Sequence, residues 1–249
     1  MKILQLLRDN AGREKRPTNA VRNGAEASLY IYDVIDAYWG VSALAVIDAI
    51  NAAGDAETLN VYINSPGGDV FEGRAIMAAL GRFKGKTIAH IDSLCASAAT
   101  SIALACGEVR MADGAFFMIH NASGLVWGDK TAMRETADLL EKVEGAIVND
   151  YTAKTGKDEK QVRAWMDAET WFTAEEAKAE GFIDSIVKEG KAKNTWNLAA
   201  FEKVPEALKA PQELPPDPKP ESKTDEPAPE AGFFMSARNA NRLRLALIA

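Results

Sequence analysis

The sequence has few of the residues that hold metals or build disulfide frameworks. Its 249 residues include two histidines, His90 and His120, and two cysteines, Cys95 and Cys106. None of them has the spacing of a metal-binding cluster, so we expect neither a metal nor another cofactor. The cysteines lie in or beside one apolar run, which predicts two buried thiols rather than a disulfide.

Long apolar runs and an excess of positive charge are also missing. No apolar run reaches the roughly 18 residues that a membrane-spanning helix needs, and the N-terminus has no signal-peptide pattern. The net charge is −7 and the pI is about 5.1, which excludes a general electrostatic attraction to nucleic acid. We expect a cytoplasmic protein that binds neither nucleic acid nor membranes.

Strand-like and helix-like segments alternate through the middle of the chain. The expected strands are 29–32, 59–63, 87–91, 108–111, 115–119 and 183–187. The expected helices are 41–53, 70–83, 96–106, 130–154, 158–167 and 174–179. This alternation predicts an α/β layered domain, and a hydrophobic content of 47% is enough for a substantial core.

Composition divides the chain into one folded domain and four further segments, one before it and three after it. The parts are a polar N-terminal segment (1–27), the domain (28–190), a connecting segment (191–210), a proline-rich linker (211–230) and a basic, apolar C-terminal segment (231–249). Seven of the ten prolines lie between Pro211 and Pro229. Such a stretch cannot bury enough apolar surface to fold, so we expect a flexible C-terminal tail that catalysis does not need, beginning near Val204.

A serine among small residues begins an apolar helix-like run, in the sequence Cys95-Ala-Ser97-Ala-Ala99. A serine in that place is usually an N-cap, and it becomes a nucleophile only when a base takes its proton. With two histidines in the chain, that base is His90 or His120. His120 follows an apolar strand and precedes a loop, so it is the better candidate; His90 lies within a strand.

A glycine pair, Gly67-Gly68, lies between an expected strand and an expected helix. Without side chains, these residues can offer unobstructed backbone N–H groups of the kind that stabilise a tetrahedral oxyanion. Together, the serine, the histidine and the glycine pair indicate acyl-transfer chemistry at Ser97.

Five segments carry a resemblance that extends over about two thirds of the chain. They are YINSPGGDVFEG (62–73), SLCASAATSIALACG (93–107), MIHNASG (118–124), the helix end at 151–156, and ETWFTAEEAKAEGFID (169–184). In order and spacing they resemble the proteolytic subunit of the Clp protease family, and more narrowly its phage and prophage head-maturation (prohead) proteases. The resemblance implies a spiral of β-β-α units, a fold similar to that of crotonases.

The resemblance also implies roles for particular residues. Ser97 corresponds to the nucleophile and His120 to the base, and the N–H groups of Gly68 and Ala98 correspond to the oxyanion hole. The acid of the triad falls at Glu169, with Asp167 as the alternative.

An extended peptide substrate would lie along two edges of this site. The residues that would contact it are Gly67, Val70, Asn121 and Leu125.

The same resemblance implies heptameric rings that stack in pairs through the helix 130–154. Its apolar positions are Met133, Ala137, Leu140, Val143 and Ile147. In a phage context the substrates would be capsid and scaffold proteins.

Three alternatives stay open. The first is a general ATP-dependent Clp degradation subunit, although neither the segment before residue 28 nor the proline-rich tail resembles that subunit, which leaves a Clp ATPase partner open. The second is a non-catalytic capsid assembly factor. The third is a crotonase-type acyl-CoA enzyme, which would not need the Ser97–His120 pair.

Overall fold

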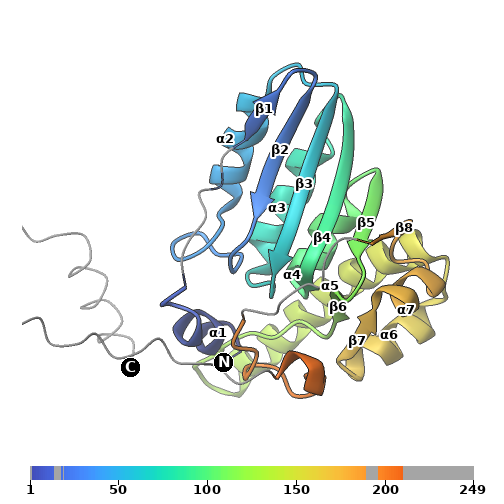
Figure 1. Cartoon of the computed structure of the whole chain (residues 1–249). Helices are drawn as coiled ribbons and strands as arrows, with labels where there is room; N and C mark the ends of the chain where they lie inside the picture. The colour runs from blue at the N-terminus through green and yellow to red at the C-terminus, as the bar shows by residue number, and fades with distance from the viewer. Residues whose placement is uncertain (1, 14–17, 19, 189–195, 210–249) are drawn as a thin grey trace, which may run out of the picture. The chain divides into compact units, whose positions relative to one another are not determined.

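The computed structural model describes residues 2–13, 18, 20–188 and 196–209 (Figure 1). The expected linker and C-terminal segment, 211–230 and 231–249, lie outside the described residues. Within the described part of the chain, no helix has the length and apolarity to cross a membrane.

An eight-stranded mixed sheet forms the centre of the fold (Figure 1). Its strands are β1 (Val21–Asn23), β2 (Glu26–Ile31), β3 (Thr58–Ser65), β4 (Lys86–Ala96), β5 (Glu108–Ala112), β6 (Phe116–Ile119), β7 (Thr170–Thr173) and β8 (Ser185–Val187). The order is β1-β2-β3-β4-β5-β8, and β6 joins β4 to β7. All neighbours are parallel except the β1–β2 and β6–β7 pairs. The predicted α/β class is confirmed.

Seven helices accompany the sheet in the described residues. They are α1 (Lys2–Asp9), α2 (Ala43–Ala53), α3 (Val70–Leu80), α4 (Ala98–Leu104), α5 (Lys130–Thr155), α6 (Glu159–Asp167) and α7 (Ala174–Ala179), followed by a 3₁₀ turn, Glu206–Leu208. Side chains cap the starts of several of them, including Asp69 on α3 and Thr173 on α7, where Thr173 and Glu176 form a capping box.

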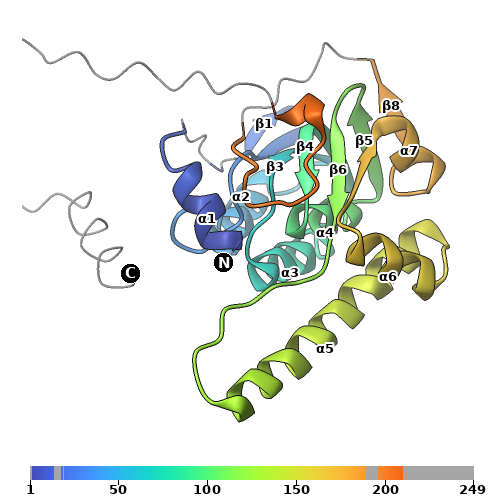
Figure 2. The same cartoon turned by 90° about the horizontal axis from the view of Figure 1, so that it is seen from below.

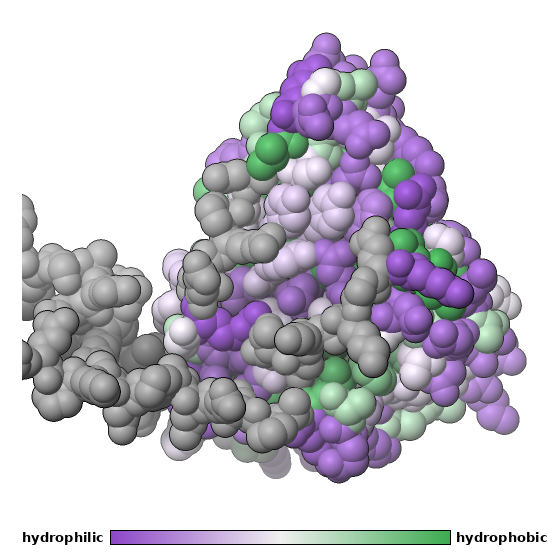
Figure 3. Space-filling model, viewed as in Figure 1, coloured by the Kyte–Doolittle hydropathy of each residue, from purple (hydrophilic) through white to green (hydrophobic). Residues whose placement is uncertain are grey.

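Side chains along each strand alternate between a covered face of the sheet and an open face. In β2, Leu29 and Ile31 are buried while Tyr30 between them is partly exposed. On the open face Tyr30 stacks on Tyr62, with ring centroids 5.0 Å apart, and Tyr62 stacks on His90 at 4.7 Å. Accordingly, the surface over the middle of β2–β4 is pale to light purple rather than green in Figure 3.

The long strand β4 changes partners along its length. Its first half, Ile88–Ile91, pairs with β5, whereas Leu94–Ala96 pairs with β6. Because β4 continues to Ala96, helix α4 begins at Ala98 and not at 96 as the sequence pattern predicted. Ser97 is therefore the residue at which the chain turns from strand to helix.

Helix α5 packs on the domain only through its C-terminal half. Ile147, Val148 and Tyr151 are buried, while Met133 near its start is exposed. Figure 2 shows the helix extending away from the sheet.

A second, smaller core lies under the C-terminal strap, the name used here for residues 196–209. Four strap residues with large side chains are buried there: Trp196, Leu198, Phe201 and Leu208. They pack with Leu94 and Met118 of the sheet and with Leu6 of α1, a helix that the polar composition of 1–27 did not predict.

The two cysteines are free and buried, as predicted. Burial raises the pKa of the Cys95 thiol well above its usual value and that of Cys106 to about 12. Both therefore stay protonated and act as small apolar side chains.

Candidate active site

Ser97 is held at the junction of β4 and α4 by its own backbone. Its N–H donates to the carbonyl of Met118 on β6 (2.9 Å), which continues the β4–β6 ladder by one step. Its φ and ψ are +53° and −127°, and its side chain does not cap α4. The hydroxyl is therefore available to a partner other than the helix.

That partner is His120. The imidazole Nε2 lies 2.8 Å from Ser97 Oγ. The β4–β6 register explains this contact. Ala96 pairs with Met118, so Ser97 and His120 both lie just beyond the ends of neighbouring strands. The structure brings together the serine and the histidine that the sequence selected.

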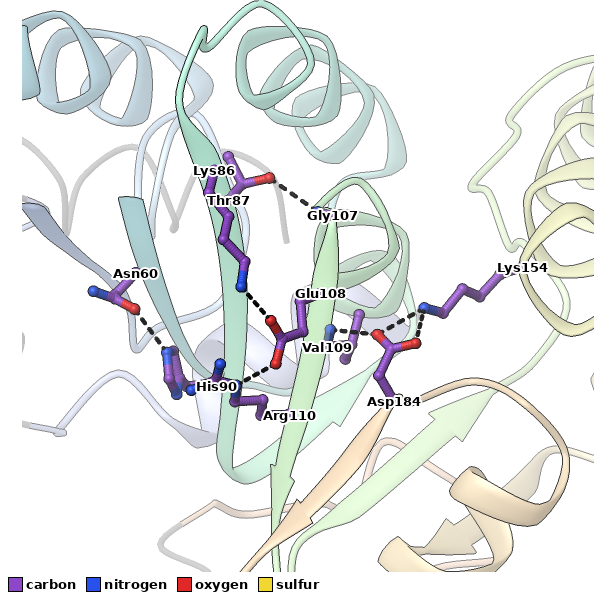
Figure 4. Close-up of polar contacts among 10 residues, drawn as sticks. All are labelled: Asn60, Lys86, Thr87, His90, Gly107, Glu108, Val109, Arg110, Lys154 and Asp184. Atoms are coloured by element: carbon purple, nitrogen blue, oxygen red, sulfur yellow. Dashed lines mark hydrogen bonds and ion pairs between the residues drawn. The ribbon is translucent and has the colours of Figure 1, made fainter. Parts of the chain in front are cut away.

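His90, the other histidine, lies elsewhere on the sheet. Its Nε2 is 3.0 Å from Asn60 Oδ1 (Figure 4). Its ring stacks on Tyr62. It belongs to the open face of β3 and β4.

The first turn of α4 is fixed by buried hydroxyl groups. The Thr100 N–H and hydroxyl both donate to the Ser97 carbonyl, at 2.9 and 2.6 Å. Because the Thr100 hydroxyl is used as a donor there, it accepts from the Tyr151 hydroxyl, 2.6 Å away. Burial raises the pKa of Tyr151, so the phenol keeps the proton that it donates. Sequence reasoning did not find these two residues.

The glycine pair lies directly against Ser97. A Cβ on Gly67 would be 2.5 Å from the Ala96 carbonyl oxygen and 2.7 Å from Ser97 Cβ, and Gly67 has a φ of +87°. Ile35 forms a bridge with this loop by donating to the Gly67 carbonyl and accepting from the Asp69 N–H, at 2.9 and 2.8 Å. The Gly68 N–H is outside that bridge, and the Ala98 N–H is one of the first N–H groups of α4, which have no partner within a helix.

The two candidate acids have different surroundings. Asp167 is exposed and accepts a hydrogen bond from Asn121 Nδ2 at 2.8 Å. Glu169 is only 7% exposed, and its Oε1 accepts from the backbone N–H groups of Glu202 and Lys203 at 2.8 and 2.7 Å.

Strand register relates Glu169 to His120. In the antiparallel β6–β7 ladder Ile119 pairs with Thr170. Extending this register by one residue pairs His120 with Glu169, whose carboxylate is buried and held by the N–H groups of Glu202 and Lys203. Asp167 lies two residues further from the ladder.

Comparisons with known proteins identify the family of the chain. A model of the Clp protease family matches residues 20–190. The chain belongs to the Clp protease family. It is 31% identical over 156 residues to the ATP-dependent Clp protease proteolytic subunit of Streptococcus suis, covering 61% of this chain and 80% of that protein. The protein of the same name from Streptococcus gordonii is also 31% identical, over 150 residues, covering 59% and 76%.

A solved structure shares the fold. A mutant ClpP1 from Listeria monocytogenes superposes with a TM-score of 0.59 at 22% identity, covering 65% of this chain and 91% of that one. As a member of the Clp protease family, the chain is a serine-type peptidase.

In this Clp protease family member a small pocket opens beside Ser97 and His120. Val70 and Asn121, two of the predicted substrate-contacting residues, line it together with Arg74. Gly67 and Leu125, the other two, are not among its lining residues, and Leu125 is 66% exposed on the loop before α5. A larger cavity of about 740 Å³ between the ends of α2 and α3 includes none of the predicted site residues.

An ion pair borders the pocket. Arg74 Nη1 of α3 lies 2.8 Å from Asp150 Oδ2 of α5. Burial raises the pKa of Asp150, an effect that the Arg74 charge opposes. This pair joins the two helices that flank the pocket.

Proposed function

We propose that this chain is an endopeptidase in which Ser97 is the nucleophile, His120 the general base and Glu169 the orienting acid. The single observation that carries the proposal is the 2.8 Å contact between His120 Nε2 and a serine hydroxyl that caps no helix. In the reaction His120 takes the hydroxyl proton as Ser97 attacks the peptide carbonyl, and then delivers it to the leaving amine.

The N–H groups of Gly68 and Ala98 would receive the oxyanion. They flank Ser97 from the glycine loop and from the start of α4, and preorganised donors of this kind stabilise a developing negative charge. The peptide would run past Gly67 and Val70 on one side and Asn121 on the other. Leu125 would contact the chain further from the scissile bond.

A fluorophosphonate probe tests this assignment. Wild type should be labelled, while Ser97→Ala and His120→Ala should each lose labelling and peptide hydrolysis by at least several thousandfold, because a triad acts as a unit. His90→Gln is the matched control, since it removes the other histidine, and it should react at the wild-type rate. Near-normal hydrolysis by Ser97→Ala would falsify the assignment.

The substrates that we propose are phage capsid and scaffold proteins. Support comes from the sequence resemblance to prohead proteases and from the basic C-terminal segment, which could dock on another protein. The relatives are named ATP-dependent proteolytic subunits, so degradation with a Clp ATPase is the alternative. Cleavage of a cognate capsid precursor at a defined site without ATP would favour head maturation, whereas ATP-dependent degradation of unrelated unfolded proteins would overturn it.

We propose that the peptidase works as a ring-shaped homo-oligomer. Apolar side chains are exposed on and before the projecting half of α5, among them Trp127 (98% exposed) and Met133 (53%). A second copy of the chain could cover them, as the resemblance to stacked heptameric rings implies. A sedimentation mass equal to one 26.9 kDa chain at micromolar concentration would refute this.

A further inference from the structure

The C-terminal strap, residues 196–209, returns to the catalytic pair although it lies beyond the segment that resembles the family. Two kinds of contact connect it to the site. Its backbone N–H groups at Glu202 and Lys203 hold the Glu169 carboxylate, and the ring of Phe201 packs on the imidazole of His120.

The Phe201 ring is placed between two rings of the site. It meets His120 edge to face, with centroids 5.6 Å apart and planes at 75°, and it meets Trp171 of β7 at 5.7 Å and 86°. Phe201 is 8% exposed. Edge-to-face contacts are favoured aromatic geometries and add about 0.5–1.5 kcal/mol beyond the area that they bury.

The strap itself is firmly attached, so this ring has a fixed position. Trp196 Nε1 donates to Asn64 Oδ1 at 2.9 Å. Asn10 forms two hydrogen bonds with the backbone of Asn197, at 2.9 and 3.0 Å. Lys203 Nζ donates to the Ala168 carbonyl at 2.6 Å, beside Glu169.

We propose that Phe201 is a positioning residue that keeps the His120 imidazole turned toward Ser97 Oγ, and that the strap thereby completes the active site. The inference rests on the proposed function of His120 as the base. An imidazole can rotate about its Cβ–Cγ bond, and a rotated ring would move Nε2 away from the serine hydroxyl. The Phe201 ring restricts that rotation, while the Glu202 and Lys203 N–H groups keep Glu169 in place.

Steady-state hydrolysis of a short peptide by full-length variants tests this role. Phe201→Ala should lower kcat about tenfold to a hundredfold with less than a twofold change in KM, because small misplacements of catalytic groups are costly and the ring does not line the substrate pocket. Phe201→Tyr keeps the flat ring and should restore kcat to within about threefold of wild type. Phe201→Leu keeps much of the volume without the ring and should resemble Phe201→Ala.

Leu208→Ala is the matched control, since Leu208 is a buried strap residue in the same cluster. It should lower the midpoint of thermal unfolding as much as Phe201→Leu does, yet leave kcat within about twofold of wild type. Equal losses of kcat in Leu208→Ala and Phe201→Leu would overturn the proposal, because the ring would then act only through general stability.

The proposed function and this inference fail in different ways. If Ser97 and His120 are not the catalytic pair, either the wild-type chain will not react with a fluorophosphonate probe or Ser97→Ala will react as wild type does. If only the inference is wrong, wild type will be labelled and Phe201→Leu will be labelled at the same rate. Labelling of Phe201→Leu that is slower than wild type and restored in Phe201→Tyr supports the positioning role.

Discussion

Ser97 and Glu169 are the two non-glycine residues with a positive φ in the described part of the chain, at +53° and +48°. Each lies at the end of a strand that pairs with β6: Ser97 follows β4 and Glu169 precedes β7. Positive φ is strained for a residue with a Cβ, at a cost on the order of 1–3 kcal/mol. The two ladders on β6 hold both residues in place.

The strain at Ser97 predicts a difference between two inactive variants. Glycine adopts positive φ without a steric penalty, so Ser97→Gly should be more stable than Ser97→Ala by about 1 kcal/mol, while neither hydrolyses peptide. Denaturant unfolding of the two variants measures the difference. Equal midpoints would mean that the backbone at residue 97 is relaxed.

The choice of the acid can be tested with a pair of amide substitutions. Glu169→Gln should lower kcat by roughly 10²–10⁴, since an amide cannot stabilise the imidazolium and favours the wrong tautomer. Asp167→Asn should stay within a few-fold of wild type, because Asp167 is exposed and bonded to Asn121. If the Asp167 variant shows the larger loss, the assignment of Glu169 is wrong.

Two glycines with nearly the same φ allow a matched test of whether the Gly67-Gly68 loop positions Ser97. Gly67 and Gly114 have φ of +87° and +85°, but only at Gly67 would a Cβ meet other atoms. Gly114→Ala should cost about 1–2 kcal/mol of stability with normal activity. Gly67→Ala should in addition displace Ser97 and lower kcat at least a hundredfold. Comparable kinetics in the two variants would show that the loop does not position the serine.

The last buried residues of the strap predict how far the C-terminus can be shortened before the protein loses stability. Composition changes near Val204, but Leu208 is buried and packs in the cluster under the strap. A chain that ends after Lys209 should hydrolyse a short peptide like the full-length protein. A chain that ends after Lys203 loses Leu208 and should be less stable by about 2–4 kcal/mol, which thermal unfolding would detect. Loss of peptide hydrolysis in the chain that ends after Lys209 would show that residues beyond 209 take part in catalysis.

Sequence reasoning selected Ser97 and His120 as candidates because their signals are local, and the structure brings their side chains into contact. A serine before an apolar helix, a glycine pair and only two histidines leave few choices. Most strands and helices between residues 29 and 187 were also readable, since hydrophobic periodicity marks the longer segments, but α1, β1 and β7 were not predicted. The end of β4 was misplaced because Cys95 and Ala96 fit a buried strand as well as the start of a helix.

Features that depend on pairing between distant segments could not be read in this way. Strand β7, with the sequence Thr-Trp-Phe-Thr, is too short to show a period, so the preference for Glu169 over Asp167 came from the resemblance and not from a predicted strand pairing. The contact between Phe201 and His120 joins residues 81 positions apart in the sequence. No pattern in the polar and apolar residues of 196–209 indicates which strand they cover.

Because β6 pairs with both β4 and β7, the candidate site is sensitive to a change in the length of the chain between β5 and β6. Side chains of a strand alternate between two faces, so a slip of one residue would turn His120 away from Ser97 and from Glu169 at once. A one-residue deletion between β5 and β6 would thus separate all three groups while leaving β2–β5 paired. Insertions should be tolerated much better in the exposed loop before α5, where no strand register depends on the length of the chain.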